Sequence, residues 1–177
     1  MKELFRNLKL FTKIVLMVGL CLTLFGFVVK KAGVYFFWES SWIGNTILLI
    51  GLGSLLIDWK NFRKSKSQKT VWNKIGIGIV IFILTVKTII AIILPRTEAY
   101  EIAKTHVVNN AEIIDEIGQV QNISFIPTGG IQVTTDSNGK YGSATVCFIL
   151  KGTKKHRTVT ILVNKYPDTD WLVEQIF

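Results

Sequence analysis

Lys87 is the most conspicuous ionisable residue of the chain, because it lies within the apolar segment 75–94. That segment has about the length a helix needs to cross a bilayer, and Lys87 lies seven residues before its end, or about 10 Å along a helix. A charge at this depth is costly unless it is paired or hydrated. Glu39, near the start of the preceding apolar segment, is the candidate partner. We therefore expect an intramembrane ion pair between Lys87 and Glu39. The alternatives are that Lys87 faces water or headgroups, or pairs with another protein.

A second candidate is a cluster of basic residues far from the apolar segments. It comprises Lys151, Lys154, Lys155 and Arg157, four bases within seven residues of a region that is otherwise slightly acidic. Such a cluster is either a solvated hairpin tip or a contact site for lipid headgroups or an acidic partner, because concentrated charge attracts opposite charge. The sequence leaves both interpretations open.

Other reactive residues are too few and too scattered to predict catalysis. The histidines are His106 and His156, and the cysteines are Cys21 and Cys147. A metal site needs several convergent ligands, and a disulfide framework needs more cysteines. The sequence also lacks a P-loop, a dinucleotide-binding fingerprint and a nucleophile elbow. We predict no catalytic, cofactor-binding or metal-binding residues, and we expect that the protein is not an enzyme.

Charge is distributed unevenly between the two halves of the chain. The 177 residues carry a net charge of +9; residues 1–94 contribute +10 from 13 bases and three acids, and residues 95–177 contribute −1 from eight bases and nine acids. Because the bases flank apolar segments, they indicate membrane topology rather than nucleic-acid binding, which we do not expect. The N-terminus and the basic loop 59–74 carry most of them, so the positive-inside rule places both in the cytoplasm.

Three apolar segments predict three transmembrane helices within residues 1–95, namely residues 14–29, 42–57 and 75–94. Gly44, Gly51 and Ser54 would form a stripe of small residues on one face of the second helix, which favours close contact with a neighbour. Three spans place residues 96–177 on the side opposite the N-terminus, outside the cytoplasm. The expected partners are the lipid bilayer and other membrane proteins. The Lys- and Ile-rich composition indicates a bacterial source, and hence the bacterial cytoplasmic membrane.

Residues 96–177 predict a small extracytoplasmic α+β domain. A first helix begins at Thr97, whose hydroxyl can cap it, and a second short helix runs from Asn109, in capping-box spacing with Glu112, to Gly118. The apolar face of the first helix comprises Ala99, Ile102, Ala103 and Val107. Alternating apolar residues then predict five strands, at residues 120–126, 131–135, 142–151, 157–165 and 171–177, with a turn at residues 127–130. The predicted fold is two helices packed on a five-stranded antiparallel meander, with Trp171 in its core.

An ordered set of short motifs in residues 97–177 resembles one known family. The set is Glu116-Ile117-Gly118, Gly130, Gly142-Ser143-Ala144, Lys151-Gly152 and Trp171-Leu172. In their order and spacing these motifs resemble the cytochrome c oxidase assembly factor 1 family, which is grouped with a subunit of the mitochondrial presequence translocase. The resemblance implies an α+β domain tethered to an inner membrane that assists the assembly of membrane complexes, and it implies no catalytic residues. The present chain has three predicted spans where the mitochondrial proteins have one.

The expected function is that of a membrane-anchored, non-enzymatic interaction module, an assembly or scaffold factor for a membrane protein complex. A respiratory oxidase is its target by resemblance only. The alternative is an extracytoplasmic sensor or regulatory subunit of a transporter or enzyme complex, in which the domain binds a small ligand. An enzyme would be favoured by paired acids or histidines within the spans, and the sequence lacks them.

Overall fold

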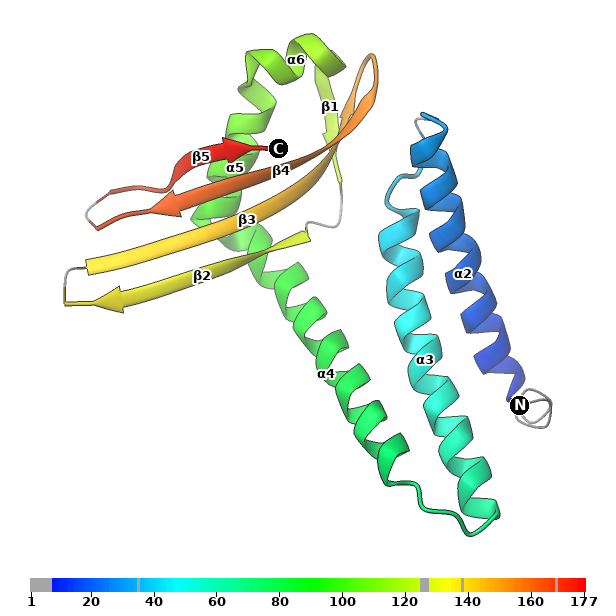
Figure 1. The fold of residues 1–177 in the computed structure, drawn as a ribbon. Coiled ribbons are helices and arrows are strands. Elements are labelled where there is room, and N and C mark those ends of the chain that lie inside the picture. Colours follow the sequence, from blue (N-terminus) through cyan, green and yellow to red (C-terminus); the bar gives the residue numbers. More distant parts are fainter. Residues whose placement is uncertain (1–7, 35, 125–127, 138, 168) are drawn as a thin grey trace. The chain divides into compact units, whose positions relative to one another are not determined.

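The computed structural model describes residues 8–34, 36–124, 128–137, 139–167 and 169–177, which divide into two compact units (Figure 1). The first unit ends at Lys87 and contains α2 (Leu10–Lys31), α3 (Ser40–Ser65) and most of α4 (Val71–Ile93). The second unit is Thr88–Phe177. The boundary falls inside α4 rather than at Pro95, because the end of this helix belongs to the core of the second unit.

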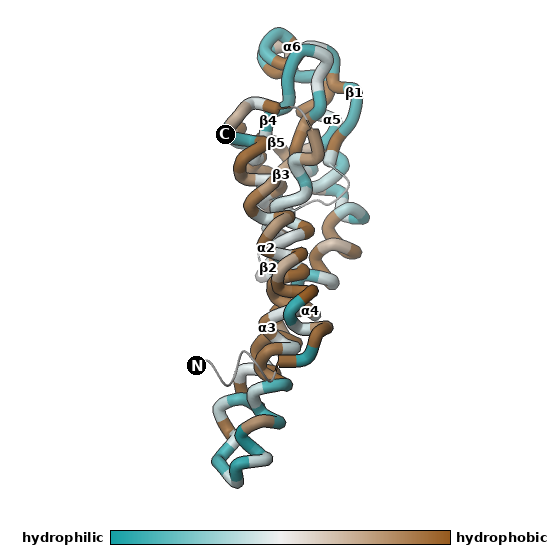
Figure 2. The backbone as a smooth tube through the Cα atoms, turned by 90° about the vertical axis from the view of Figure 1, so that its right-hand side faces the viewer, coloured by the Kyte–Doolittle hydropathy of each residue, from teal (hydrophilic) through white to brown (hydrophobic). Residues whose placement is uncertain are grey.

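Within the described part of the chain, three helices are long and apolar enough to cross a membrane: α2, α3 and α4. They include the three predicted segments and extend beyond them. Much of the basic loop 59–74 is helical, because α3 continues to Ser65 and α4 begins at Val71, so only residues 66–70 lie between helices. Figure 2 shows the helices mostly brown and this linker in teal.

Small residues allow α2 and α3 to lie side by side with their backbones in close contact. A side-chain carbon added to Gly44 would lie 2.5 Å from the backbone nitrogen of Thr23, and one added to Gly26 would lie 2.5 Å from that of Ser41. Gly51 lies against the side chain of Leu16. Such glycines are typical of tightly packed helices in lipid, and Gly44 and Gly51 occupy the predicted stripe.

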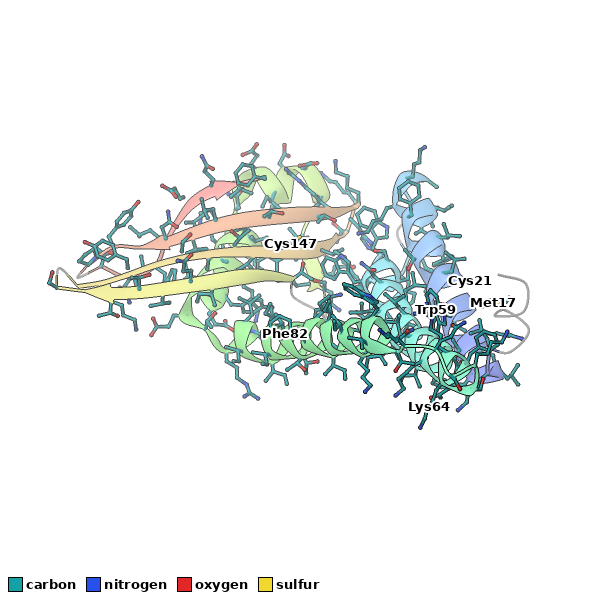
Figure 3. All side chains as sticks on the ribbon, turned by 60° about the horizontal axis from the view of Figure 1, so that its bottom comes forward. Met17, Cys21, Trp59, Lys64, Phe82 and Cys147 are labelled. Atoms are coloured by element: carbon teal, nitrogen blue, oxygen red, sulfur yellow. The ribbon has the colours of Figure 1, made fainter. Side chains whose placement is uncertain are left out.

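The part of α4 that belongs to the first unit packs more loosely than the other two helices. Its contacts with α3 include Val80 beside Gly53 and Leu56 beside Gly76. The buried residues of α4 are Asn73 and Val80, whereas large apolar side chains such as Phe82 are exposed. Figure 3 shows Phe82 projecting from this helix.

The second unit begins with two capped helices that follow a 3-10 turn, η1 (Leu94–Arg96). In α5 (Glu98–Asn109) the Thr97 side chain accepts a hydrogen bond from the Tyr100 backbone N–H, as predicted. The cap of α6 (Ala111–Ile117) is Asn110 rather than the predicted Asn109. Asn109 still belongs to α5 and donates its side-chain amide to the Thr105 carbonyl, whereas Asn110 has the extended backbone that a cap requires.

The end of α6 requires a glycine. Gly118 follows the last helical residue with φ at +78°, a backbone conformation that is strained for residues with a side-chain carbon, and its N–H donates to the Ile114 carbonyl. The predicted end of this helix at Gly118 is therefore confirmed.

Among the described residues, five strands form one antiparallel sheet: β1 (Val120–Ile123), β2 (Thr128–Asp136), β3 (Gly139–Gly152), β4 (His156–Lys165) and β5 (Leu172–Ile176). The long strand β3 pairs with β4 on one side and with both β1 and β2, end to end, on the other. The predicted meander is therefore wrong at β1, which pairs with β3 rather than with β2, because β3 is long enough for both strands. Ser124 continues the pairing beyond β1, through its backbone N–H and its hydroxyl, both bonded to Ile149. The predicted turn at residues 127–130 is wrong for residues 128–130, which begin β2; residues 125–127 lie outside the described residues.

One face of the sheet forms the hydrophobic core of the second unit together with the helices. Ala144, Val146, Phe148 and Leu150 of β3 alternate on this face, beside Val159, Ile161 and Val163 of β4. Buried residues of α5 and α6 join the same cluster, and the rings of Tyr100 and Phe148 lie 5.3 Å apart. Burial raises the pKa of Tyr100, and the charge of Glu101 adds to this. Trp171 is 6% exposed, which confirms its predicted place in the core.

Candidate functional site

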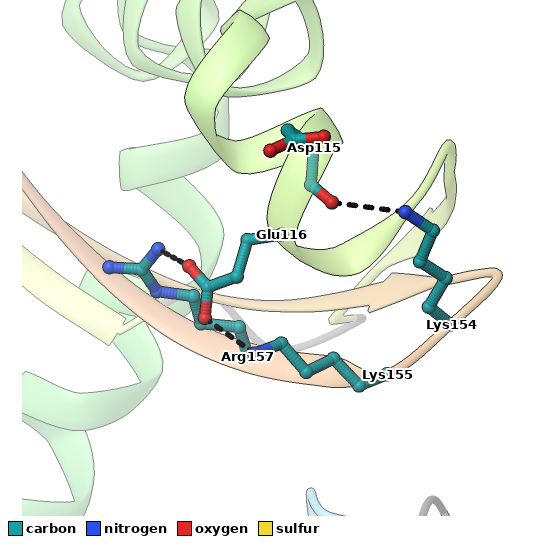
Figure 4. A network of polar contacts seen from close by, with 5 residues as sticks. All are labelled: Asp115, Glu116, Lys154, Lys155 and Arg157. Atoms are coloured by element: carbon teal, nitrogen blue, oxygen red, sulfur yellow. Dashed lines mark hydrogen bonds and ion pairs between the residues drawn. The ribbon is translucent and has the colours of Figure 1, made fainter.

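The predicted basic cluster lies at the turn between β3 and β4, where it contacts the end of α6 (Figure 4). The Lys155 ammonium lies 2.7 Å from one carboxylate oxygen of Glu116, and the Arg157 guanidinium binds the other. The Lys154 ammonium donates to the backbone carbonyl of Asp115 over 3.1 Å. The side chains of Lys154, Lys155 and Arg157 therefore bind within the domain.

Backbone contacts hold the same turn against α6. The N–H groups of Lys154 and Lys155 both donate to the Ile117 carbonyl, at 2.9 and 3.4 Å, and Thr153 donates to Gln119. A side-chain carbon at Gly152 would lie only 2.2 Å from the Ile117 carbonyl oxygen, so the turn needs a glycine here. Because the last carbonyls of a helix carry partial negative charge, lysines are favourable at this position. The cluster acts as a cap for α6.

Glu116 is the ionisable residue most affected by this arrangement. The hydrogen bond from Lys155 lowers the pKa of the Glu116 carboxyl below its ordinary value of 4.5, and the charges of Arg157 and Lys155 and the hydrogen bond from Arg157 add to this lowering. Loss of hydration acts in the opposite direction and does not overcome it. Glu116 is thus held as a carboxylate between two cations.

The ion pair of Lys87 with Glu39 stays a prediction, and the structure gives Lys87 a contact with α3. The Lys87 ammonium donates to the Thr46 hydroxyl of α3 over 3.5 Å, whereas Glu39 occupies the position that precedes the first turn of α3 and is 6% exposed. Thr46 lies seven residues after Glu39, which is about two helical turns or 10 Å along the helix axis. The Lys87 ammonium therefore contacts α3 about two turns beyond Glu39.

Asp58 is a polar residue of the helical hairpin that sequence reasoning missed. Its carboxylate accepts a hydrogen bond from the Thr12 hydroxyl at 2.7 Å and another from the Lys9 backbone N–H at 3.1 Å. Asp58 is 8% exposed, and it binds the first turn of α2, where backbone N–H groups carry partial positive charge. In the sequence Asp58 stands at the start of the basic segment, and nothing local indicates that the first turn of α2 lies beside it.

The other end of the same hairpin carries a cation between aromatic rings. The Lys30 ammonium lies 5.9 Å from the ring centre of Trp38 and 5.6 Å from that of Trp42. Both distances allow attraction between the ammonium and the electron-rich ring faces. The hairpin of α2 and α3 is therefore held by a carboxylate at one end and by a lysine at the other.

The sheet face opposite the core carries an open groove of about 350 Å³. It is lined by Gln132, Thr134, Tyr141, Gly142, Ser143, Asn164, Lys165 and Tyr166, which come from β2, β3, β4 and the residue after β4. Sequence reasoning did not find this groove, because it depends on how three strands are aligned. Across the described residues, no three His, Cys, Asp or Glu side chains are grouped so that they could hold a metal ion.

Comparison with known proteins found no relative of this chain. No family model, no curated protein and no solved structure matches the chain.

Proposed function

We propose that this protein is an integral membrane protein with three spans, and that it acts as a non-enzymatic interaction module that helps to assemble or hold together a membrane protein complex. In this proposal the N-terminus and the basic linker lie in the cytoplasm of a bacterium, and the second unit lies outside it. The positive-inside rule supports the orientation, and the length and apolar character of α2, α3 and α4 support the three spans.

The observation that carries the proposal is an exposed lysine on a loosely packed apolar helix. Exposed apolar side chains of α4 include adjacent residues, Ile81, Phe82 and Ile83, so they cover more than one face of the helix. Lipid accommodates such side chains but not the ammonium of Lys87, which is exposed and has only the long contact to Thr46 among its described hydrogen bonds. Another membrane protein on this side of α4 would supply both the apolar contact and a polar partner.

The resemblance to the cytochrome c oxidase assembly factor 1 family agrees with this role, since the family assists the assembly of membrane complexes. It suggests a respiratory oxidase as the target. The contacts of the basic cluster weaken the idea that Lys154, Lys155 and Arg157 mainly bind headgroups, because these side chains already bind α6. The partner contact is therefore assigned to α4.

Photo-crosslinking in intact cells tests the proposal. A benzophenone amino acid replaces Phe82 of α4 in one variant and Met17 of α2 in a matched control; both native side chains are 69% exposed. We expect the Phe82 probe to yield one adduct of fixed mass that mass spectrometry identifies as an integral membrane protein. The adduct should persist in Lys87→Arg, which keeps the charge, and disappear in Lys87→Met.

Three results would contradict the proposal. The Phe82 probe could give only lipid adducts, or it could give the same protein adducts as the Met17 probe. A band at twice the mass of the chain would identify a second copy of this protein as the neighbour of α4, and the assembly role would then be wrong.

A further inference from the structure

The groove on the open face of the sheet has a regular construction that follows from strand register. Gln132 pairs with Ser143, and Ser143 pairs with Asn164, so these three side chains form one row across β2, β3 and β4. Thr134 pairs with Tyr141, which forms the next row on the same face, and Tyr166 follows β4 beside it. The small Ser143 between two longer amides makes the floor of the groove, and Gln132 and Asn164 make its walls.

The lining favours a ligand with many hydroxyl groups. Gln132 and Asn164 each offer a donor and an acceptor, and the hydroxyls of Thr134, Tyr141 and Ser143 can act as either. The Asn164 amide nitrogen donates to the Glu174 carboxylate, which fixes the orientation of the side chain. The amide oxygen of Asn164 is buried and accepts no hydrogen bond from the part of the protein that the structure describes.

Charge argues against an anionic ligand. Lys165 is the basic residue among those that line the groove, and its ammonium lies 3.9 Å from the Glu98 carboxylate of α5, a helix whose buried residues join the core on the other face. The carboxylate of Glu174 lies beside Asn164 and would repel a phosphate or a carboxylate. A purely apolar ligand is disfavoured as well, because the lining contains no aliphatic side chain of Leu, Ile or Val.

We propose that this groove is a binding site for a neutral sugar chain. Tyr141 and Tyr166 lie at one end of the groove, and the electron-rich face of a tyrosine ring attracts the C–H groups of a sugar ring. The volume of about 350 Å³ lies at the lower end of the range for ligand pockets, roughly 300–1,000 Å³, which suits one or two sugar rings of a chain that continues into solvent. Sugar binding would be a second role beside the proposed interaction role. The groove includes neither α4 nor Lys87, so either proposal can fail while the other holds.

Binding is measured on the full chain in lipid nanodiscs, because detergents with sugar headgroups would compete for the groove. The probes are cellotetraose and chitotetraose, which differ in their acetamide groups, and the readout is saturation-transfer NMR followed by titration. We expect at least one of the two to bind. Ser143→Leu fills the floor of the groove and should weaken binding at least about tenfold. Asn164→Ala removes one wall of the groove and should also weaken binding about tenfold.

Thr145→Leu is the matched control, since Thr145 is exposed two residues further along the same face of β3 but does not line the groove. It should bind as the native chain does. All variants are compared for thermal unfolding, and Gln132→Ala on β2 replaces any variant that does not fold. The proposal is overturned if neither sugar binds the folded native chain, or if Ser143→Leu and Thr145→Leu bind equally. Binding of an unstructured Gly-Ser octapeptide in place of both sugars would reassign the groove to peptides.

Discussion

At the residue scale, Asp58 joins the end of one apolar helix to the beginning of another. Its carboxylate accepts hydrogen bonds from the Lys9 backbone N–H and the Thr12 hydroxyl, two donors at the start of α2 that would otherwise bind water. In an apolar environment, donors without a partner are costly, so this single side chain matters more than its position next to a basic segment suggests. Thr12, which is 1% exposed, depends on it directly.

Removing the Asp58 carboxylate should destabilise the hairpin. Asp58→Ala leaves the Lys9 N–H and the Thr12 hydroxyl unpaired, and we expect a loss of about 1–3 kcal/mol in the free energy of unfolding, measured by tryptophan fluorescence in nanodiscs. Asp58→Asn keeps an acceptor and should cost less. In combination with Thr12→Val the losses should not be additive, because both changes remove the same contact. Additive losses would show that the two side chains act independently.

Trp171 is a large side chain in the core of the second unit. Its ring packs on Gly142, where an added side-chain carbon would lie 2.3 Å from a ring carbon. Trp171→Ala should lower the free energy of unfolding by about 3–5 kcal/mol, because it leaves a cavity that the sheet cannot fill. The control is Leu172→Ala at the next residue, which is 55% exposed and should change stability by no more than about 0.5 kcal/mol. Equal effects of the two changes would mean that Trp171 is not a core residue.

At the element scale, the β3–β4 turn and α6 stabilise each other. A helix of seven residues is too short to be stable alone, so α6 relies on its cap at Asn110, on its buried isoleucines and on the contacts around Glu116. The pKa of Glu116 is lowered in the folded protein, so its contribution to stability is fully present above about pH 4.5. That contribution is lost as the pH falls through the lowered pKa.

Hydrogen exchange of α6, corrected for intrinsic rates, should show this dependence. In the native chain, protection of α6 should be constant above about pH 4.5 and decrease at lower pH, because protonation of Glu116 removes its pairs with Lys155 and Arg157. Glu116→Gln should show, at every pH, the reduced protection that the native chain has only at low pH. Glu112→Gln, an exposed position of the same helix, serves as the control and should behave like the native chain. If Glu116→Gln keeps native protection at neutral pH, the pairs do not hold α6.

Local patterns predicted the elements better than they predicted the contacts between them. Thr97 and Gly118 mark helix ends through their own chemistry, so the sequence alone located them. Asn109 and Asn110 are both suitable caps, and the choice depends on where α5 stops. Gly129-Gly130 resembles a turn, yet β3 is long enough to pair with this segment as a strand. The contact of Lys87 with Thr46, the role of Asp58 and the groove around Ser143 all depend on how separate elements are aligned, which no local pattern specifies.

At the scale of the whole molecule, the proposed topology makes a prediction for chemical labelling. In a variant without Cys21 and Cys147, a single cysteine at Thr153 in the β3–β4 turn should react with a membrane-impermeant maleimide in intact, wall-stripped cells. A cysteine at Ser67, in the linker between α3 and α4, should react only after permeabilisation, because its basic neighbours favour the cytoplasm. The reverse pattern would invert the orientation, and labelling of both sites in intact cells would show that the two segments share one side.

The burial of Leu94 determines how far the second unit can travel. Leu94 is 1% exposed and directly follows α4, and Ile90 in the last turns of α4 packs against the same core. The described residues between the helix and the domain therefore include no flexible linker, whose reach would grow with the square root of its length. If α4 crosses a membrane, the core of the domain begins at the end of the span itself, so the diffusion of the domain is confined to the membrane surface. It would then meet molecules anchored in the same plane far more often than molecules dissolved further away.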